Sequence, residues 1–132
     1  MLKNILFHPV FIHFPIAFCF LEPLLLLMWA LKKDEAYRRF SFISFRLAYV
    51  LMALTVVTGL WDAGGFNRLA GAVAVHFYFG LGLFIFYTAR ALCMKRVRRS
   101  VYFASIQIAG ALLGNGLVAA TAYFGGKLVY PS

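Results

Sequence analysis

The stretch "VFIHFPIAFCFLEPLLLLMWAL", residues 10–31, decides the fold class, because Glu22 is its only Asp, Glu, Lys or Arg. A helix of roughly 20 apolar residues crosses the ~30 Å hydrocarbon core of a bilayer. Three further stretches meet that criterion, near residues 41–61, 70–92 and 102–124. With 64% hydrophobic and 13% charged residues, the composition is that of an integral membrane protein. We therefore expect an all-α protein, with residues 1–132 forming one four-transmembrane-helix bundle.

The basic residues predict how the bundle is oriented. The chain carries a net charge of +9, yet most of its Lys and Arg side chains lie in or beside the first and third connectors: Lys32, Lys33, Arg38, Arg39, Arg46, Arg90, Lys95, Arg96, Arg98 and Arg99. Cytoplasmic loops carry this excess of positive charge. We expect both termini on the outer, periplasmic face of a bacterial inner membrane, with the lipid bilayer as the partner of the charge and no nucleic acid bound.

The sequence also suggests an internal repeat of two helical hairpins. "FIHF" at 11–14 and "AVHF" at 74–77 both enter from the outer side, and "GG" follows the second and fourth spans. Nearly equal intervals separate His13 from Gly64 and His76 from Gly125. Two hairpins related by an axis along the membrane normal explain this pattern.

His13 and His76 are the candidate ligands for a cofactor. They lie at similar depths in two helices that run in the same direction, their predicted levels differing by about one helical turn. Two imidazoles at matched depth on different helices can hold a flat macrocycle between them, and haem b needs no covalent attachment motif. The alternative is that each histidine makes an ordinary hydrogen bond near the headgroups.

Three other side chains are candidates for supporting roles. His8 precedes Pro9, so we expect it at or before the helix start, in water or headgroups. Asp62 ends "TGLWD" and either accepts the second N–H of a ligating histidine or has no partner. Glu22 is expected to be protonated, paired with a residue such as Arg46, or open to a water-filled cavity; if functional, it relays protons.

The remaining polar and small residues predict packing. Gln107 and Asn115 are expected to form interhelical hydrogen bonds, and "GALLG" at 110–114 is a small-xxx-small pattern that permits close helix approach. We expect Cys19 and Cys93 to be unpaired, because they lie at different depths. The first apolar segment lacks a small-residue cleavage site, so we read it as a retained helix.

"HPVFIHFPIAF" at 8–18, "TGLWDAG" at 58–64, His76 and the terminal "GGKLVY" at 125–130 resemble the small four-helix bacterial membrane proteins of domain-of-unknown-function family twenty-two thirty-one. The resemblance covers nearly the whole chain. It implies the four-helix topology and marks His8, His13, Asp62, His76 and residues 125–130 as pattern positions. Members look like b-type cytochromes and accompany c-type cytochrome domains.

We therefore expect a haem-b electron-transfer subunit that exchanges electrons with a quinone or a cytochrome partner. Because no nucleophile and base can be placed together, a stand-alone enzyme is not expected. A cofactor-free accessory subunit of a larger membrane complex is the alternative. A third interpretation is a metal site made by His8, His13, His76 and Asp62.

Overall fold

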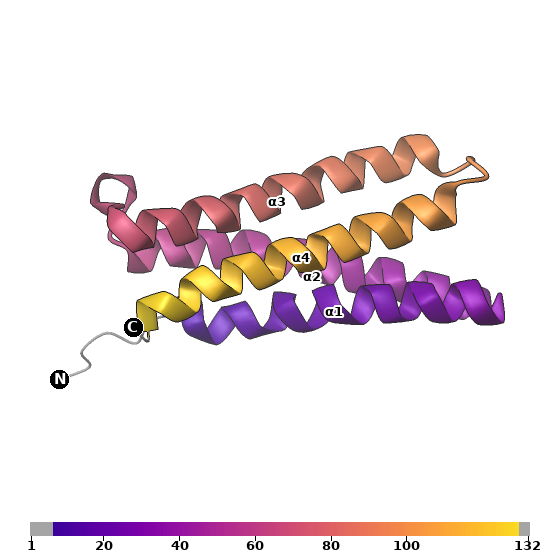
Figure 1. Cartoon of the computed structure of the whole chain (residues 1–132), viewed down its shortest axis with the longest axis horizontal. Helices are drawn as coiled ribbons and strands as arrows, with labels where there is room; N and C mark the ends of the chain where they lie inside the picture. The colour runs from indigo at the N-terminus through magenta and orange to yellow at the C-terminus, as the bar shows by residue number, and fades with distance from the viewer. Residues whose placement is uncertain (1–6, 130–132) are drawn as a thin grey trace.

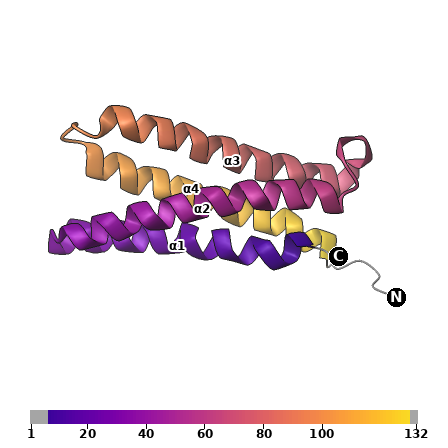
Figure 2. The same ribbon diagram turned by 180° about the vertical axis from the view of Figure 1, so that it is seen from behind.

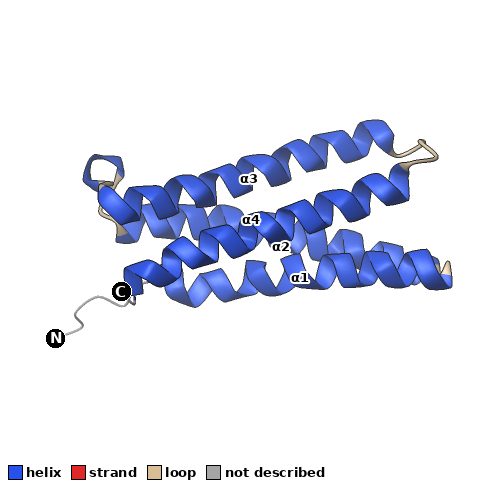
Figure 3. Cartoon of the chain, in the orientation of Figure 1, coloured by secondary structure: helices blue, strands red, loops and turns tan. Residues whose placement is uncertain are grey.

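The chain folds into four long helices. The computed structural model describes residues 7–129, and within this range it contains α1 (Phe7–Lys32), α2 (Glu35–Asp62), the short 3-10 helix η1 (Phe66–Arg68), α3 (Gly71–Val97) and α4 (Phe103–Val129) (Figure 1). No strand occurs among the described residues (Figure 3). Each of the four long helices is apolar and long enough to cross a membrane. The predicted fold class is confirmed.

The helices extend past the predicted spans, most of all at the start of α2. Only Lys33 and Asp34 separate α1 from α2, where the sequence suggested a nine-residue connector. Lys33 takes a left-handed conformation (φ 57°), and the Asp34 side chain accepts the Ala36 N–H at 2.8 Å as a helix cap. An ion pair between Glu35 and Arg38 supports the first turn. Because these polar residues are good cap and helix residues, the helices continue beyond the apolar spans.

The helices form two antiparallel hairpins, α1–α2 and α3–α4, packed side by side (Figures 1 and 2). Each helix packs on two neighbours: α1 and α3 both pack on α2 and α4, so α1 and α3 lie across the bundle from each other. We call the end where α1 begins and α4 ends the terminal end; it also carries the α2–α3 connection. Large apolar side chains such as Leu24, Val57 and Leu113 cover the outside. That surface requires a lipid environment.

The two glycines of "GALLG" receive side chains from α3. A Cβ built on Gly110 would lie 2.7 Å from Nε of Arg90, and one on Gly114 would lie 3.0 Å from the ring of Tyr87. The Tyr87 ring also stacks on Phe45 with a centroid distance of 5.5 Å. The predicted close-approach pattern therefore lets two large side chains of α3 lie flat against α4.

Glu22 pairs with Arg90 inside the bundle. The two guanidinium nitrogens of Arg90 lie 2.6 and 3.0 Å from the two carboxylate oxygens of Glu22, and Gln107 Oε1 accepts a further N–H at 3.3 Å. Both charged residues are buried, with Glu22 2% and Arg90 8% exposed. Of the three alternatives for Glu22, the structure shows the paired one, but the partner is Arg90 and not Arg46, whose side chain is exposed. Arg90, assigned from sequence to the basic inner cluster, belongs to the core.

This pair joins the two hairpins. Glu22 comes from α1 and Arg90 from α3, so separated hairpins would each carry an uncompensated charge within the hydrocarbon. The bidentate geometry satisfies both ions at once. The pair therefore favours this association of hairpins over others that bury the same apolar area.

Arg90→Leu is predicted to destabilise the bundle strongly, because it leaves Glu22 buried without its partner, a loss of about 3–5 kcal/mol. Replacing both Glu22 and Arg90 by leucine should cost less than the single change. The free energy of unfolding in mixed detergent micelles measures both variants. The matched control is Arg46→Leu, at an exposed arginine, and equal losses for Arg46→Leu and Arg90→Leu would contradict the assignment.

Candidate functional site

The terminal end of the bundle brings two histidines together across its interior. His8 lies in the first turn of α1 and His76 is the sixth residue of α3. Their Nε2 atoms are 3.5 Å apart, and the rings meet edge to face with centroids 5.7 Å apart. Because α1 and α3 are diagonal helices, this contact crosses the bundle.

The other ring nitrogen of each histidine is held by a backbone carbonyl. His8 Nδ1 lies 2.9 Å from the Thr55 carbonyl oxygen on α2, and His76 Nδ1 lies 3.1 Å from the Thr121 carbonyl oxygen on α4. A carbonyl can only accept a hydrogen bond, so each Nδ1 carries the hydrogen and each neutral ring leaves Nε2 as a bare acceptor. When both rings are neutral, two Nε2 lone pairs therefore face each other at 3.5 Å, and either a proton on one ring or a metal cation between the rings stabilises the contact.

Each ring rests on a glycine. A Cβ on Gly59 would lie 2.9 Å from His8 Nδ1, and a Cβ on Gly125 would lie 2.8 Å from His76 Cε1. In both hairpins the glycine follows, by one helical turn, the threonine whose carbonyl accepts the ring N–H. Only a residue without a side chain lets the imidazole reach that carbonyl. We call each threonine and glycine pair a histidine seat.

The two seats confirm the internal repeat and correct its alignment. His8 and His76 are 68 residues apart, and so are Glu22 and Arg90. The caps also correspond: Asp34 accepts the Ala36 N–H, and Ser100 accepts the Tyr102 N–H at the start of the other hairpin's second helix. The equivalent of His76 is thus His8, five residues before the histidine chosen from sequence.

The predicted pairing of His13 with His76 does not form in the structure. His13 is five residues after His8, which turns its side chain about 140° around the helix. Since His8 points into the bundle, His13 points out, and its side chain is exposed. His8 itself was expected in water or headgroups, but it lies within α1 with a half-buried ring.

Asp62 supports the site through the backbone. Its carboxylate Oδ2 accepts the backbone N–H of His8 at 2.9 Å and leaves the ring alone. Neither alternative from the sequence describes this contact: Asp62 has a partner, but the partner is the backbone N–H of His8 and not the ring of a histidine. Asp62 therefore ties the last residue of α2 to the backbone of α1 at His8.

Glu22 is not part of the histidine site. It lies fourteen residues after His8, about 21 Å along the helix. Arg90 stands at the same interval from His76, so the described bundle has two polar layers with apolar core between them, including Met52, Leu83 and Val118.

Two further predictions are confirmed. Asn115 forms an interhelical hydrogen bond, in which its Nδ2 donates to the Cys19 carbonyl at 3.0 Å, and Cys19 and Cys93 are free.

The sequence did not predict the histidine seats, which are formed by Thr55, Gly59, Thr121 and Gly125. Their signal is the repeated Thr-x-x-x-Gly of "TVVTG" at 55–59 and "TAYFG" at 121–125. The glycines were read as general markers of the repeat, and "GG" at 64–65 was aligned in place of Gly59. Gly64 and Gly65 instead form the turn after α2, with φ of 80° and 95°.

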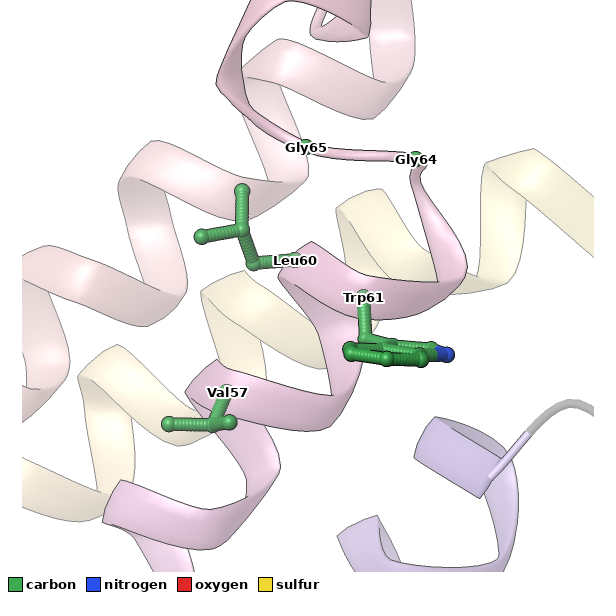
Figure 4. A pocket seen from close by; sticks show the side chains of 5 residues that line it. All are labelled: Val57, Leu60, Trp61, Gly64 and Gly65. Atoms are coloured by element: carbon green, nitrogen blue, oxygen red, sulfur yellow. The ribbon is translucent and has the colours of Figure 1, made fainter.

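Two other places that could hold a metal do not offer a set of ligands. Between residues 7 and 129 no three His, Cys, Asp or Glu side chains come together as an ion site, which speaks against the four-ligand interpretation with His8, His13, His76 and Asp62. A hollow of about 470 Å³ beside the turn is lined by apolar groups, including Val57, Leu60 and the 79% exposed Trp61, and offers no donor set (Figure 4). Among the described residues the opposed histidines bring two nitrogen donors together, fewer than the three ligands of such an ion site.

Gly59→Ala and Gly125→Ala are predicted to displace their histidine rings, because the added methyl group overlaps the ring atoms. We expect each to lower the free energy of unfolding by about 1–3 kcal/mol. Gly82→Ala and Gly116→Ala are matched controls: an added Cβ meets nothing there, and alanine should stabilise the helix by up to about 1 kcal/mol. Equal effects at all four glycines in thermal unfolding would contradict the seats.

Comparison with known proteins agrees with this architecture. The model of the family described as "Predicted membrane protein (DUF2231)" matches residues 4–132. No curated protein and no solved structure matches the chain. The match covers both hairpins with all of the residues of the site, and so the chain belongs to the predicted membrane protein family DUF2231.

Proposed function

We propose that the protein is a membrane electron-transfer subunit that holds haem b between His8 and His76. The observation that carries this proposal is the pair of bare Nε2 atoms that face each other across the bundle at 3.5 Å. Bis-histidine ligation uses this arrangement, with one imidazole from each side of the macrocycle.

The donor set fits haem iron. An imidazole nitrogen lies about 2.0–2.1 Å from a transition metal such as zinc, so two ligands on opposite sides of one ion are about 4 Å apart. The 3.5 Å between the two Nε2 atoms is therefore close to the separation of two nitrogen ligands on one metal ion. Gly59 and Gly125 lie against the two rings, and an added Cβ on Gly80 would meet only the Thr121 methyl group, at 4.0 Å.

The carbonyls of Thr55 and Thr121 supply the second contact that metal-bound histidines commonly make. By accepting the Nδ1 hydrogens they fix the tautomer and the ring orientation, and they raise the basicity of Nε2. When bound, haem supplies reversible one-electron chemistry at its iron. The protein contributes rigid axial ligands, and such ligands favour electron transfer over binding of an external ligand to the iron.

The basic residues at the opposite end support the orientation of the site. Lys33, Arg39, Arg98 and Arg99 are exposed around the α1–α2 and α3–α4 connections. By the positive-inside rule these connections face the cytoplasm, which puts the histidines near the outer face of a bacterial inner membrane. The partners we propose are a quinone in the bilayer and a c-type cytochrome on the periplasmic side.

His8→Ala and His76→Ala are each predicted to abolish the six-coordinate, low-spin haem spectrum of the purified protein. His13→Ala is the matched control, at an exposed histidine on the same helix, and should leave the spectrum unchanged. Visible spectra of the oxidised and reduced forms measure this after expression with sufficient haem.

Two results would overturn the proposal. Colourless wild-type protein that also fails to take up added haem would favour a cofactor-free accessory subunit, particularly if a stoichiometric partner copurifies. A haem spectrum that survives the double change of His8 and His76 would place the iron elsewhere.

A further inference from the structure

The two histidines of the site differ in how their backbone N–H groups are held. His76 is the sixth residue of α3, beyond the four N–H groups that a helix start leaves without an intrahelical partner. The N–H of His8 instead donates to a side chain of α2. Pro9, the next residue, has no N–H to donate. The backbone of α1 at His8 is therefore tied to the neighbouring helix.

Asp62 supplies this contact. Its Oδ2 accepts the His8 N–H at 2.9 Å, and its negative charge is favourable at the start of α1. The second helices of the two hairpins are offset by 66 residues, as Thr55 is from Thr121, so the residue that corresponds to Asp62 is Leu128, whose side chain cannot accept a hydrogen bond. The second hairpin has no need of one, because α3 begins five residues before its histidine.

We propose that Asp62 is a positioning residue for the His8 ligand. It acts on the backbone and holds the first turn of α1, so that the His8 ring stays on the Gly59 seat with Nε2 toward His76. This inference rests on the proposed haem function, which it deepens by adding a residue that controls one axial ligand and not the other.

The experiment compares Asp62→Asn with Asp62→Ala. The asparagine oxygen still accepts the His8 N–H, whereas alanine offers no acceptor. Loss of an outer-shell partner typically lowers metal affinity about 10–100-fold, so we expect that loss of haem affinity for Asp62→Ala. Asp62→Asn should stay within about threefold of wild type, well below the loss expected for Asp62→Ala.

Asp34→Ala is the matched control. Asp34 also accepts a backbone N–H, that of Ala36, but at the opposite end of the bundle. Both alanine changes remove one capping hydrogen bond and should lower stability by about 1 kcal/mol. Only Asp62→Ala should change the low-spin signal in electron paramagnetic resonance. Equal effects of the two alanine changes on that signal, or none from either, would overturn the proposal.

A measurement on haem-free protein separates this inference from the haem proposal. In nitrogen-15 spectra of labelled histidine, Asp62→Ala should shift the His8 ring signals, and Asp62→Asn should keep them near wild type. If wild-type protein binds no haem, the proposed haem function is wrong, but the His8 ring signals still test whether Asp62 positions His8. Unchanged His8 signals in Asp62→Ala would overturn the positioning role.

Discussion

The site depends on one constraint: each imidazole must reach a backbone carbonyl of the adjacent helix. The His8 and His76 rings do so only because the next helical turn of α2 and of α4 carries a glycine, Gly59 or Gly125. Once Nδ1 is bound in this way, Nε2 has a single direction, toward the centre of the bundle. The helices on one diagonal, α1 and α3, provide the histidines, and those on the other diagonal, α2 and α4, provide the seats.

The Glu22–Arg90 pair provides a second constraint at a different depth in the bundle. Helices in lipid gain little from burying apolar surface against each other, so a buried ion pair has a larger share in choosing partners than it would in water. Glu22 and Arg90 occupy equivalent positions of the repeat, as His8 and His76 do. They carry opposite charges, whereas the histidine layer has identical residues. The histidine layer thus pairs two identical residues whose ring nitrogens face each other, and the Glu22–Arg90 layer pairs two opposite charges.

The sequence predicted the helices, their number and the repeat, because these depend on apolar length and on spacing. It also singled out His76, Asp62 and an ion partner for Glu22. It could not choose between His8 and His13, since that choice depends on which side of α1 faces the interior, and apolar residues surround α1 on all sides. Arg90 was assigned to the basic cluster for a related reason. Near a basic connector, the sequence does not distinguish a buried arginine from the exposed arginines beside it unless its buried partner is known.

An experimental structure of haem-loaded protein would show whether iron lies between the two histidine nitrogens. Anomalous scattering at the iron absorption edge locates the metal without assuming any ligand. We expect one peak between His8 Nε2 and His76 Nε2, with the Nδ1 contacts to Thr55 and Thr121 retained. A peak beside His13, or an unchanged 3.5 Å contact between the two rings in haem-loaded protein, would contradict it.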